Sequence, residues 1–189
     1  MSKIQTNQIQ HTQNGAAVFT LPTSDGSSGQ VLKTNASGVL SFATGGKILQ
    51  VQQATKGDTT SFSTGSSTLA DSYFDISGLS VTLTPSSGTK CFITYTVHSC
   101  GQSGYGHGLS LLRGNTSLYR GASSGNKQRL SNFVYCNNNN QIDVFQGEFL
   151  DTHGADGSTA VTYKLQMYVA TPGWTVWLNR AGTSEADSR

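Results

Sequence analysis

The feature that most constrains the fold is a strict alternation of apolar and polar residues in short runs. Leu79, Val81 and Leu83 alternate with hydroxyl residues, and Phe92–Ser99 alternates in the same way. A period of two is typical of a β-strand with one buried face, because successive side chains point to opposite faces. Further runs rich in β-branched and aromatic residues also predict strands. These are Ile48–Val51, Leu109–Arg113, Ser117–Arg120, Leu130–Tyr135, Ile142–Leu150, Ala160–Val169 and Thr175–Asn179. We therefore expect an all-β sandwich or jelly roll of eight or more short strands.

Composition excludes several other classes. About half of the 189 residues are Gly, Ser, Thr, Asn or Gln, and only two are Glu, whereas coiled coils and helical bundles are rich in Glu, Lys, Leu, Ala and Arg. Twelve basic residues stand against ten acidic ones with no basic cluster, so nucleic-acid binding is not expected. No apolar run has the length of a membrane span. The first residues lack an apolar signal core, which predicts synthesis in a cytosol.

Residues 1–46 differ from the remainder and predict a separate segment. Gln30–Thr34 and Val39–Ala43 flank Asn35–Gly38, which indicates a β-hairpin with a four-residue turn. A lone hairpin is too thin to be stable, and the simplest partner is another copy of the chain. Gly45-Gly46 is a credible hinge, so we expect an attachment segment at 1–46 and a sandwich domain at 47–189.

Patterns that could carry chemistry are weak. The run Gly121–Gly125 matches the G-x-S-x-G nucleophile pattern but is followed by a β-like run instead of a helix. His98, Cys100 and His107 could supply three metal ligands, but their spacing matches no established zinc signature. Asp151–Gly157 lacks the alternating oxygen ligands of a calcium loop.

An odd number of cysteines argues against a disulfide framework. Cys91 and Cys100 lie nine residues apart on one predicted strand, and Cys136 lies beyond it. We expect three free thiols, and no catalytic, cofactor-binding or metal-binding residue.

Polar, Gly-rich loops are the expected place for any recognition, because a rigid sandwich can present variable loops. Gly101–Gly108 and Asn137–Asn140 are interpreted as hairpin tips. We expect two or more loops to share one end of the sandwich and to form any receptor contact, with Tyr105, His107 and Asn138 as the contact residues. The loops considered are Ser99–Gly108, Ala122–Gln128, Asn137–Gln141 and Asp151–Ser158.

Two stretches resemble bacteriophage virion appendage proteins of the tail-fibre and head-fibre type. Val18–Phe42 is similar to a segment common near the N-termini of such fibres. Within Lys47–Arg180, several motifs are similar to a recurrent C-terminal module of these proteins, which resembles the trimeric jelly roll of the tumour-necrosis-factor type: Ile76–Ser87, Leu111–Thr116, Phe149–Asp151, Thr162–Gln166 and Val176–Arg180. Family members usually have a last hydrophobic strand after the segment that matches Thr183–Arg189, where this sequence ends.

The resemblance implies a non-enzymatic structural protein of a phage particle, assembled in the host cytoplasm and located in the virion. It implies a homotrimeric fibre or spike that contributes to host-surface attachment, contacts other virion proteins through residues 1–46 and binds a host surface glycan. A capsid decoration or vertex protein with a mechanical role is one alternative, and a soluble glycan-binding jelly-roll module is another. No cofactor, nucleic acid or membrane insertion is expected.

Overall fold

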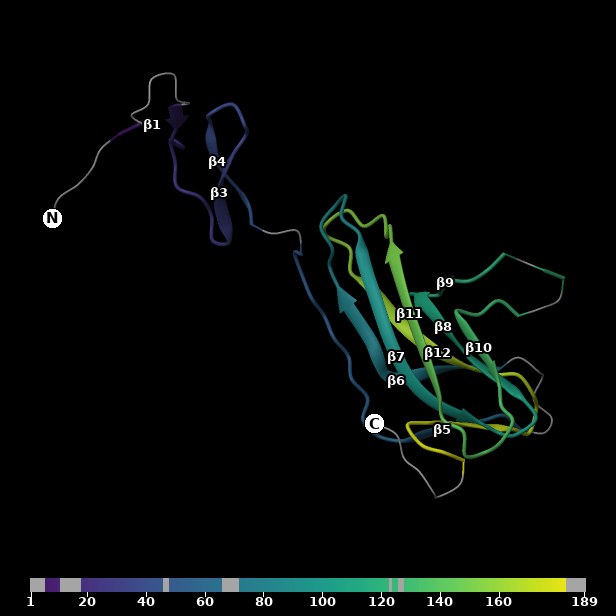
Figure 1. Ribbon diagram of the computed structural model, residues 1–189. Helices are drawn as coiled ribbons and strands as arrows, with labels where there is room; N and C mark the ends of the chain where they lie inside the picture. Colours follow the sequence, from purple (N-terminus) through teal and green to yellow (C-terminus); the bar gives the residue numbers. More distant parts are fainter. Residues whose placement is uncertain are drawn as a thin grey trace. The chain divides into compact units, whose positions relative to one another are not determined.

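The computed structural model describes residues 6–10, 18–45, 48–65, 72–122, 124–125 and 128–182. The chain is all-β and divides into two compact units, Met1–Val51 and Gln52–Arg189 (Figure 1). In the described ranges, no helix has the length and apolar character that a membrane span requires. Gly46, the second residue of the expected hinge, lies outside the described residues.

The first unit consists of two small antiparallel ladders. Strands β1 (Gln8–Gln10) and β2 (Val18–Thr20) form one ladder, and β3 (Gln30–Thr34) and β4 (Leu40–Thr44) form the other. The predicted hairpin is confirmed, and the Asn35 N–H donates to the Val39 carbonyl at 3.1 Å across its turn. A parallel bridge between Thr20 and Val39 joins the two ladders.

The second unit is built from two antiparallel sheets. Strands β5 (Thr60–Ser63), β7 (Cys91–Gly101), β11 (Asp143–Asp151) and β13 (Thr175–Leu178) form one sheet in the order β11-β7-β13-β5. Strands β6 (Ser72–Leu83), β8 (Gly106–Arg113), β10 (Asn132–Tyr135) and β12 (Val161–Val169) form the other in the order β10-β8-β12-β6, and the short β9 (Thr116–Leu118) pairs with β8.

This strand order is that of a jelly roll. Without the short β9, the second unit has eight strands. When these are counted in chain order, the first, eighth, third and sixth strands (β5, β13, β7 and β11) form one sheet. The second, seventh, fourth and fifth strands form the other sheet. The jelly-roll expectation from the sequence is confirmed.

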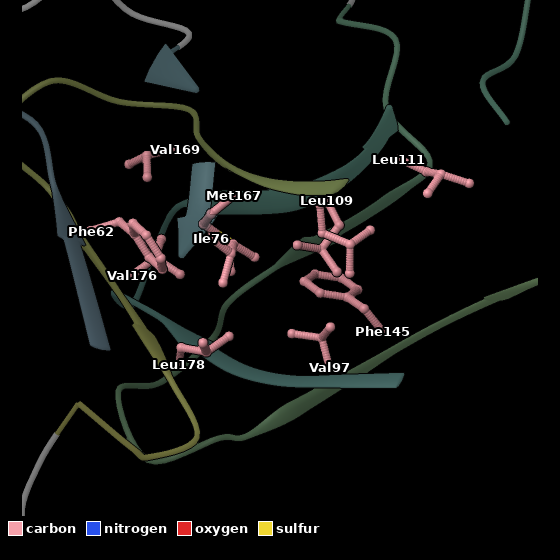
Figure 2. Close-up of a cluster of buried hydrophobic side chains, with 11 residues drawn as sticks. Phe62, Ile76, Val97, Leu109, Leu111, Phe145, Met167, Val169, Val176 and Leu178 are labelled. Carbon is pink, nitrogen blue, oxygen red and sulfur yellow. The ribbon is translucent and has the colours of Figure 1, made fainter. Parts of the chain in front are cut away.

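The core lies between the two sheets, as expected for face-to-face packing. Eleven buried side chains form it, and Figure 2 draws this cluster as sticks with ten of the residues labelled. They come from β5, β6, β7, β8, β11, β12 and β13: Phe62, Ile76, Val97, Leu109, Leu111, Phe145, Leu165, Met167, Val169, Val176 and Leu178. The predicted alternation holds on β7, where Val97 faces this core while Phe92 remains 64% exposed.

A β-bulge lets β6 run for twelve residues along β12. Phe74 and Ile76 face inward before it, and Leu79 and Val81 face inward after it. The inward-facing residues therefore change from even to odd numbers at the bulge. The pairing register shifts at this point, and Gly78 has φ +88°. Glycine tolerates this conformation because it has no Cβ to collide with the backbone.

Three local predictions are wrong. Ile48–Val51 is not a strand, and Ile48 and Val51 are 77% and 78% exposed, since no neighbouring strand pairs with them. Gly101–Gly108 and Asn137–Asn140 are not hairpin tips, because each connects strands of different sheets, β7 to β8 and β10 to β11. None of the four asparagines has a positive φ.

Candidate functional site at one end of the jelly roll

The β7–β8 and β10–β11 loops meet at one end of the sandwich. The Ser103 N–H donates to Asn139 Oδ1 at 2.6 Å, and the Ser103 hydroxyl donates to the Asn137 carbonyl at 2.8 Å. The Gly104 N–H donates to the Cys136 carbonyl at 2.7 Å, and the Cys136 N–H donates to the Tyr105 carbonyl at 2.9 Å. Four hydrogen bonds therefore hold two of the four expected recognition loops against each other.

The β12–β13 loop adds an aromatic pair to the same end. The rings of Tyr105 and Trp174 stack with centroids 3.8 Å apart and planes inclined by 31°. The Thr175 N–H donates to Gln102 Oε1 at 3.3 Å, and Thr64 Oγ1 donates to the Thr171 carbonyl at 2.8 Å. Both rings are half-buried, so each contributes to packing and keeps part of its surface in solvent.

Asn138 is exposed at the apex of the β10–β11 loop, as a contact residue must be. Its Oδ1 accepts the Asn140 N–H at 2.6 Å, and the amide nitrogen of this exposed side chain can act as a donor.

His107 is placed incorrectly by the sequence interpretation. It lies on β8 opposite Val134 of β10, and its exposed fraction is 0%. It therefore cannot touch a receptor, because it belongs to the inward-facing set of β8 with Leu109 and Leu111. Extending that period-two pattern two residues toward the N-terminus would have predicted the burial.

The loop Asp151–Ser158 does not join this end. Asp151 closes the opposite end of the nine-residue strand β11 from Asp143, so the loop that follows it lies at the other end of the sandwich. Only part of Ala122–Gln128 is described, and there Gln128 Oε1 accepts from the Tyr73 hydroxyl of β6 at 2.9 Å.

A buried polar cluster lies directly beneath the loop end. The Nδ1 atom of His107 lies 3.1 Å from Cys136 Sγ, and Nε2 lies 2.9 Å from Ser99 Oγ. Cys136 Sγ also lies 3.8 Å from Oδ2 of Asp143, the first residue of β11. Gly101 packs against this pair, because a Cβ there would lie 2.5 Å from Cys136 Sγ and 2.6 Å from His107 Nδ1.

Burial keeps the imidazole of His107 and the thiols of Cys136 and Cys100 uncharged. It lowers the pKa of His107 to about 4, so the imidazole is neutral at pH 7. Burial, with a contribution from nearby Asp143, raises the pKa of Cys136 to about 11. Burial raises the pKa of Cys100 too. Protonated buried thiols are poor nucleophiles, so this Cys–His pair does not resemble an activated catalytic pair.

The three cysteines are free and buried, as predicted. Cys91 and Cys100 both lie on β7, near its two ends. The Cys100 thiol donates to the Asn139 carbonyl at 3.0 Å, on the side of β7 opposite to Ser99 and His107.

The other end of the sandwich has a pocket of about 350 Å³. Arg113, His153 and Asp156 are among its lining residues. Asp156 Oδ1 accepts the N–H groups of Ser158 and Thr159 at 2.9 Å each, and these bonds hold its pKa well below the usual range. Asp156 thus closes a turn of its own loop.

The G-x-S-x-G pattern has the wrong surroundings for a nucleophile. Gly121 and Gly125 lie in the connection between β9 and β10, and Ser123 lies outside the described residues. A nucleophile of this type needs a strand before it and a helix after it, and here both neighbours along the chain are strands.

Sequence reasoning did not foresee that His107, Cys136, Asp143 and Ser99 meet. Ser99 and His107 are eight residues apart, and Cys136 and Asp143 are seven apart, but 29 residues separate His107 from Cys136. Their meeting depends on the pairing of β8 with β10 and on the packing of the two sheets. His98, considered as a ligand with Cys100 and His107, sits on the opposite face of β7 from Ser99 and is half-exposed. No protein-family model matches the chain, and a search of curated proteins finds no matching sequence.

Proposed function

We propose that the chain is a non-enzymatic structural protein of a bacteriophage particle, which forms a homotrimeric fibre or spike and contributes to host-surface attachment. The observation that carries this proposal is the amount of apolar surface that the first unit leaves in solvent. Val31, Leu32 and Val39 are 43%, 48% and 45% exposed, and Ile9 is 54% exposed. Two-stranded ladders of this size are not stable alone, and exposed apolar groups of this kind mark an interaction surface.

Apolar side chains on the outer faces of the jelly roll also favour self-association. Phe92 on β7 faces Leu150 on β11 across the ladder, and they are 64% and 54% exposed. Phe133 and Tyr135 on β10 are 58% and 57% exposed. Outward residues of a soluble sheet are ordinarily polar, so these positions suit contact with further copies of the chain or with other virion proteins.

Sedimentation of the full chain tests the oligomer. We expect a particle of three 20.0-kDa chains at micromolar concentration. Leu32 and Phe42 face each other in the β3–β4 ladder and are both exposed, so Leu32→Ser with Phe42→Ser should dissociate the trimer. Ser41→Ala is the matched control, because Ser41 is an exposed polar residue on β4, next to Phe42. A stable folded monomer of the unmodified chain would refute the proposal.

The loop end carries the proposed host contact. Tyr105 with Trp174 presents an aromatic face, and Asn138 supplies an amide donor on the loop that is hydrogen-bonded to the Tyr105 loop. This combination suits a surface glycan. Tyr105→Ala together with Asn138→Ala should reduce adsorption of assembled particles to host cells while the trimer persists. Thr152→Ala, at the opposite end of the sandwich, is the control.

Unchanged adsorption in correctly assembled particles would reject the contact role. It would favour the alternative of a capsid decoration or vertex protein with a mechanical role. Electron microscopy of intact particles, which locates the protein on the tail or the capsid, separates the two.

A further inference from the structure

The buried cluster of His107, Cys136 and Asp143 has the composition of a transition-metal site. It offers an imidazole nitrogen, a sulfur and a carboxylate oxygen, which all lie within 4.8 Å of one another. These are the three ligand types of protein zinc sites. The three residues come from different parts of the fold: β8, the residue after β10, and the first residue of β11.

We propose that His107, Cys136 and Asp143 bind one Zn²⁺ ion through Nδ1, Sγ and a carboxylate oxygen. Tetrahedral zinc with ordinary bond lengths separates such ligand atoms by about 3.3–3.6 Å. The observed separations are 3.1 Å from Nδ1 to Sγ and 3.8 Å from Sγ to Oδ2. The site therefore requires ligand shifts of a few tenths of an ångström along these two edges, with water as the fourth ligand.

The surroundings of two ligands are those of a built metal site. The other nitrogen of His107 is paired with Ser99 Oγ at 2.9 Å. When Nε2–H donates to that hydroxyl, Nδ1 keeps its lone pair and points at the cluster. Asp143 is oriented in the same way, because its Oδ1 accepts from Gln141 Nε2 at 2.8 Å. Metal-binding imidazoles and carboxylates are characteristically held by such outer hydrogen bonds.

The charge balance also favours a cation. Among the described residues, no Lys or Arg nitrogen lies within ion-pair distance of the Asp143 carboxylate. The single Cys136 proton cannot satisfy His107 Nδ1 and Asp143 Oδ2 at once, although both lie near the sulfur. A divalent ion would replace that proton and attract all three ligands. The thiol makes zinc a better candidate than the hard cations calcium and magnesium, which take oxygen ligands.

Such an ion would link the two sheets beneath the recognition loops. His107 and Cys136 belong to the β10-β8-β12-β6 side, and Asp143 begins β11 of the other sheet. Asp143 is half-buried, so the ion can reach the cluster from its side.

Cobalt(II) titration of the chelator-treated full chain tests the proposal, because a thiolate–cobalt bond gives a charge-transfer absorption band. We expect one Co²⁺ per chain, the thiolate band, the intense visible bands of tetrahedral cobalt, and displacement by Zn²⁺. Cys136→Ser should abolish the thiolate band. Cys91→Ser and Cys100→Ser, which remove the other two buried thiols, should retain it.

Two milder variants keep the test decisive if Cys136→Ser does not fold. Ser99→Ala should weaken cobalt binding by about 10–100-fold through loss of the hydrogen bond to the imidazole. Asp143→Asn, at a half-exposed position, should weaken it by at least a similar factor. Absence of the thiolate band in the unmodified chain would overturn the proposal. Its loss in Cys100→Ser instead of Cys136→Ser would also overturn it, as would unchanged affinity in both milder variants.

Discussion

Replacing Arg113 with Leu should destabilise the jelly roll by about 3–5 kcal/mol, because it leaves a buried carboxylate without its cation. Nη1 of Arg113 donates to both carboxylate oxygens of Asp151, at 2.9 and 2.8 Å. Asp151 is 5% exposed, and in the described part of the chain the other side chain that donates to it is Tyr163, through its hydroxyl at 2.7 Å. One phenol cannot replace a guanidinium that contacts both oxygens.

The reverse change should cost less. The Arg113 side chain is 29% exposed, so water can reach the guanidinium when Asp151→Ala removes its partner. The main loss is then the unsatisfied Tyr163 hydroxyl, which costs about 1–3 kcal/mol. The order of the two variants thus follows from which member of the pair is buried.

Urea denaturation at one fixed protein concentration measures both variants. Lys164→Leu is the matched control, because its partner Asp75 has a side chain 58% exposed. Such a surface pair contributes about 0–1 kcal/mol. The reasoning is refuted if Arg113→Leu costs no more than this control, or if Asp151→Ala costs more than Arg113→Leu.

Three further predictions follow from packing, backbone conformation and burial. Leu109→Ala, at a fully buried position, should cost about 2–5 kcal/mol in urea denaturation, whereas Leu150→Ala, 54% exposed, should change stability by less than about 1 kcal/mol in chains kept at one oligomeric state. Gly78→Val should cost about 1–2 kcal/mol because φ is +88°, although no atom obstructs a Cβ there; a neutral effect would contradict the bulge argument. Burial raises the pKa of Tyr95 to about 12, so the folded chain keeps a proton that the unfolded chain loses near pH 10; stability should fall as pH rises from about 10 to 12, and Tyr95→Phe should show a smaller fall.

Local pattern predicted most of the strands. The period-two runs at Phe92–Ser99 and Ile142–Leu150 became β7 and β11 with nearly the expected bounds. β5 was missed because Phe62 is the one apolar residue in Thr60–Ser63. The apolar run at Ile48–Val51 gave the opposite error, since hydrophobicity without a pairing strand does not make a ladder.

The candidate site could be predicted only in part. The polar, Gly- and Asn-rich sequences around Tyr105 and Asn138 predicted surface loops, because such residues favour turns and are seldom buried. Predicting the burial of His107 required extending the β8 pattern from Leu109 past Gly108, and His107 itself stands between two glycines, which carry no hydropathy signal. Its approach to Cys136 depends on long-range pairing, about which a local pattern contains no information.

The jelly-roll order has a consequence for how the chain is made. β5 pairs with β13, and β6 pairs with β12, so each early strand waits for a partner roughly 100 residues later in translation. At about 5–20 residues per second, a nascent chain would hold these unpaired edges for about 5–20 s. The neighbours β8, β9 and β10 are the local exception, and this three-stranded segment can form while the ribosome is still adding β11 to β13.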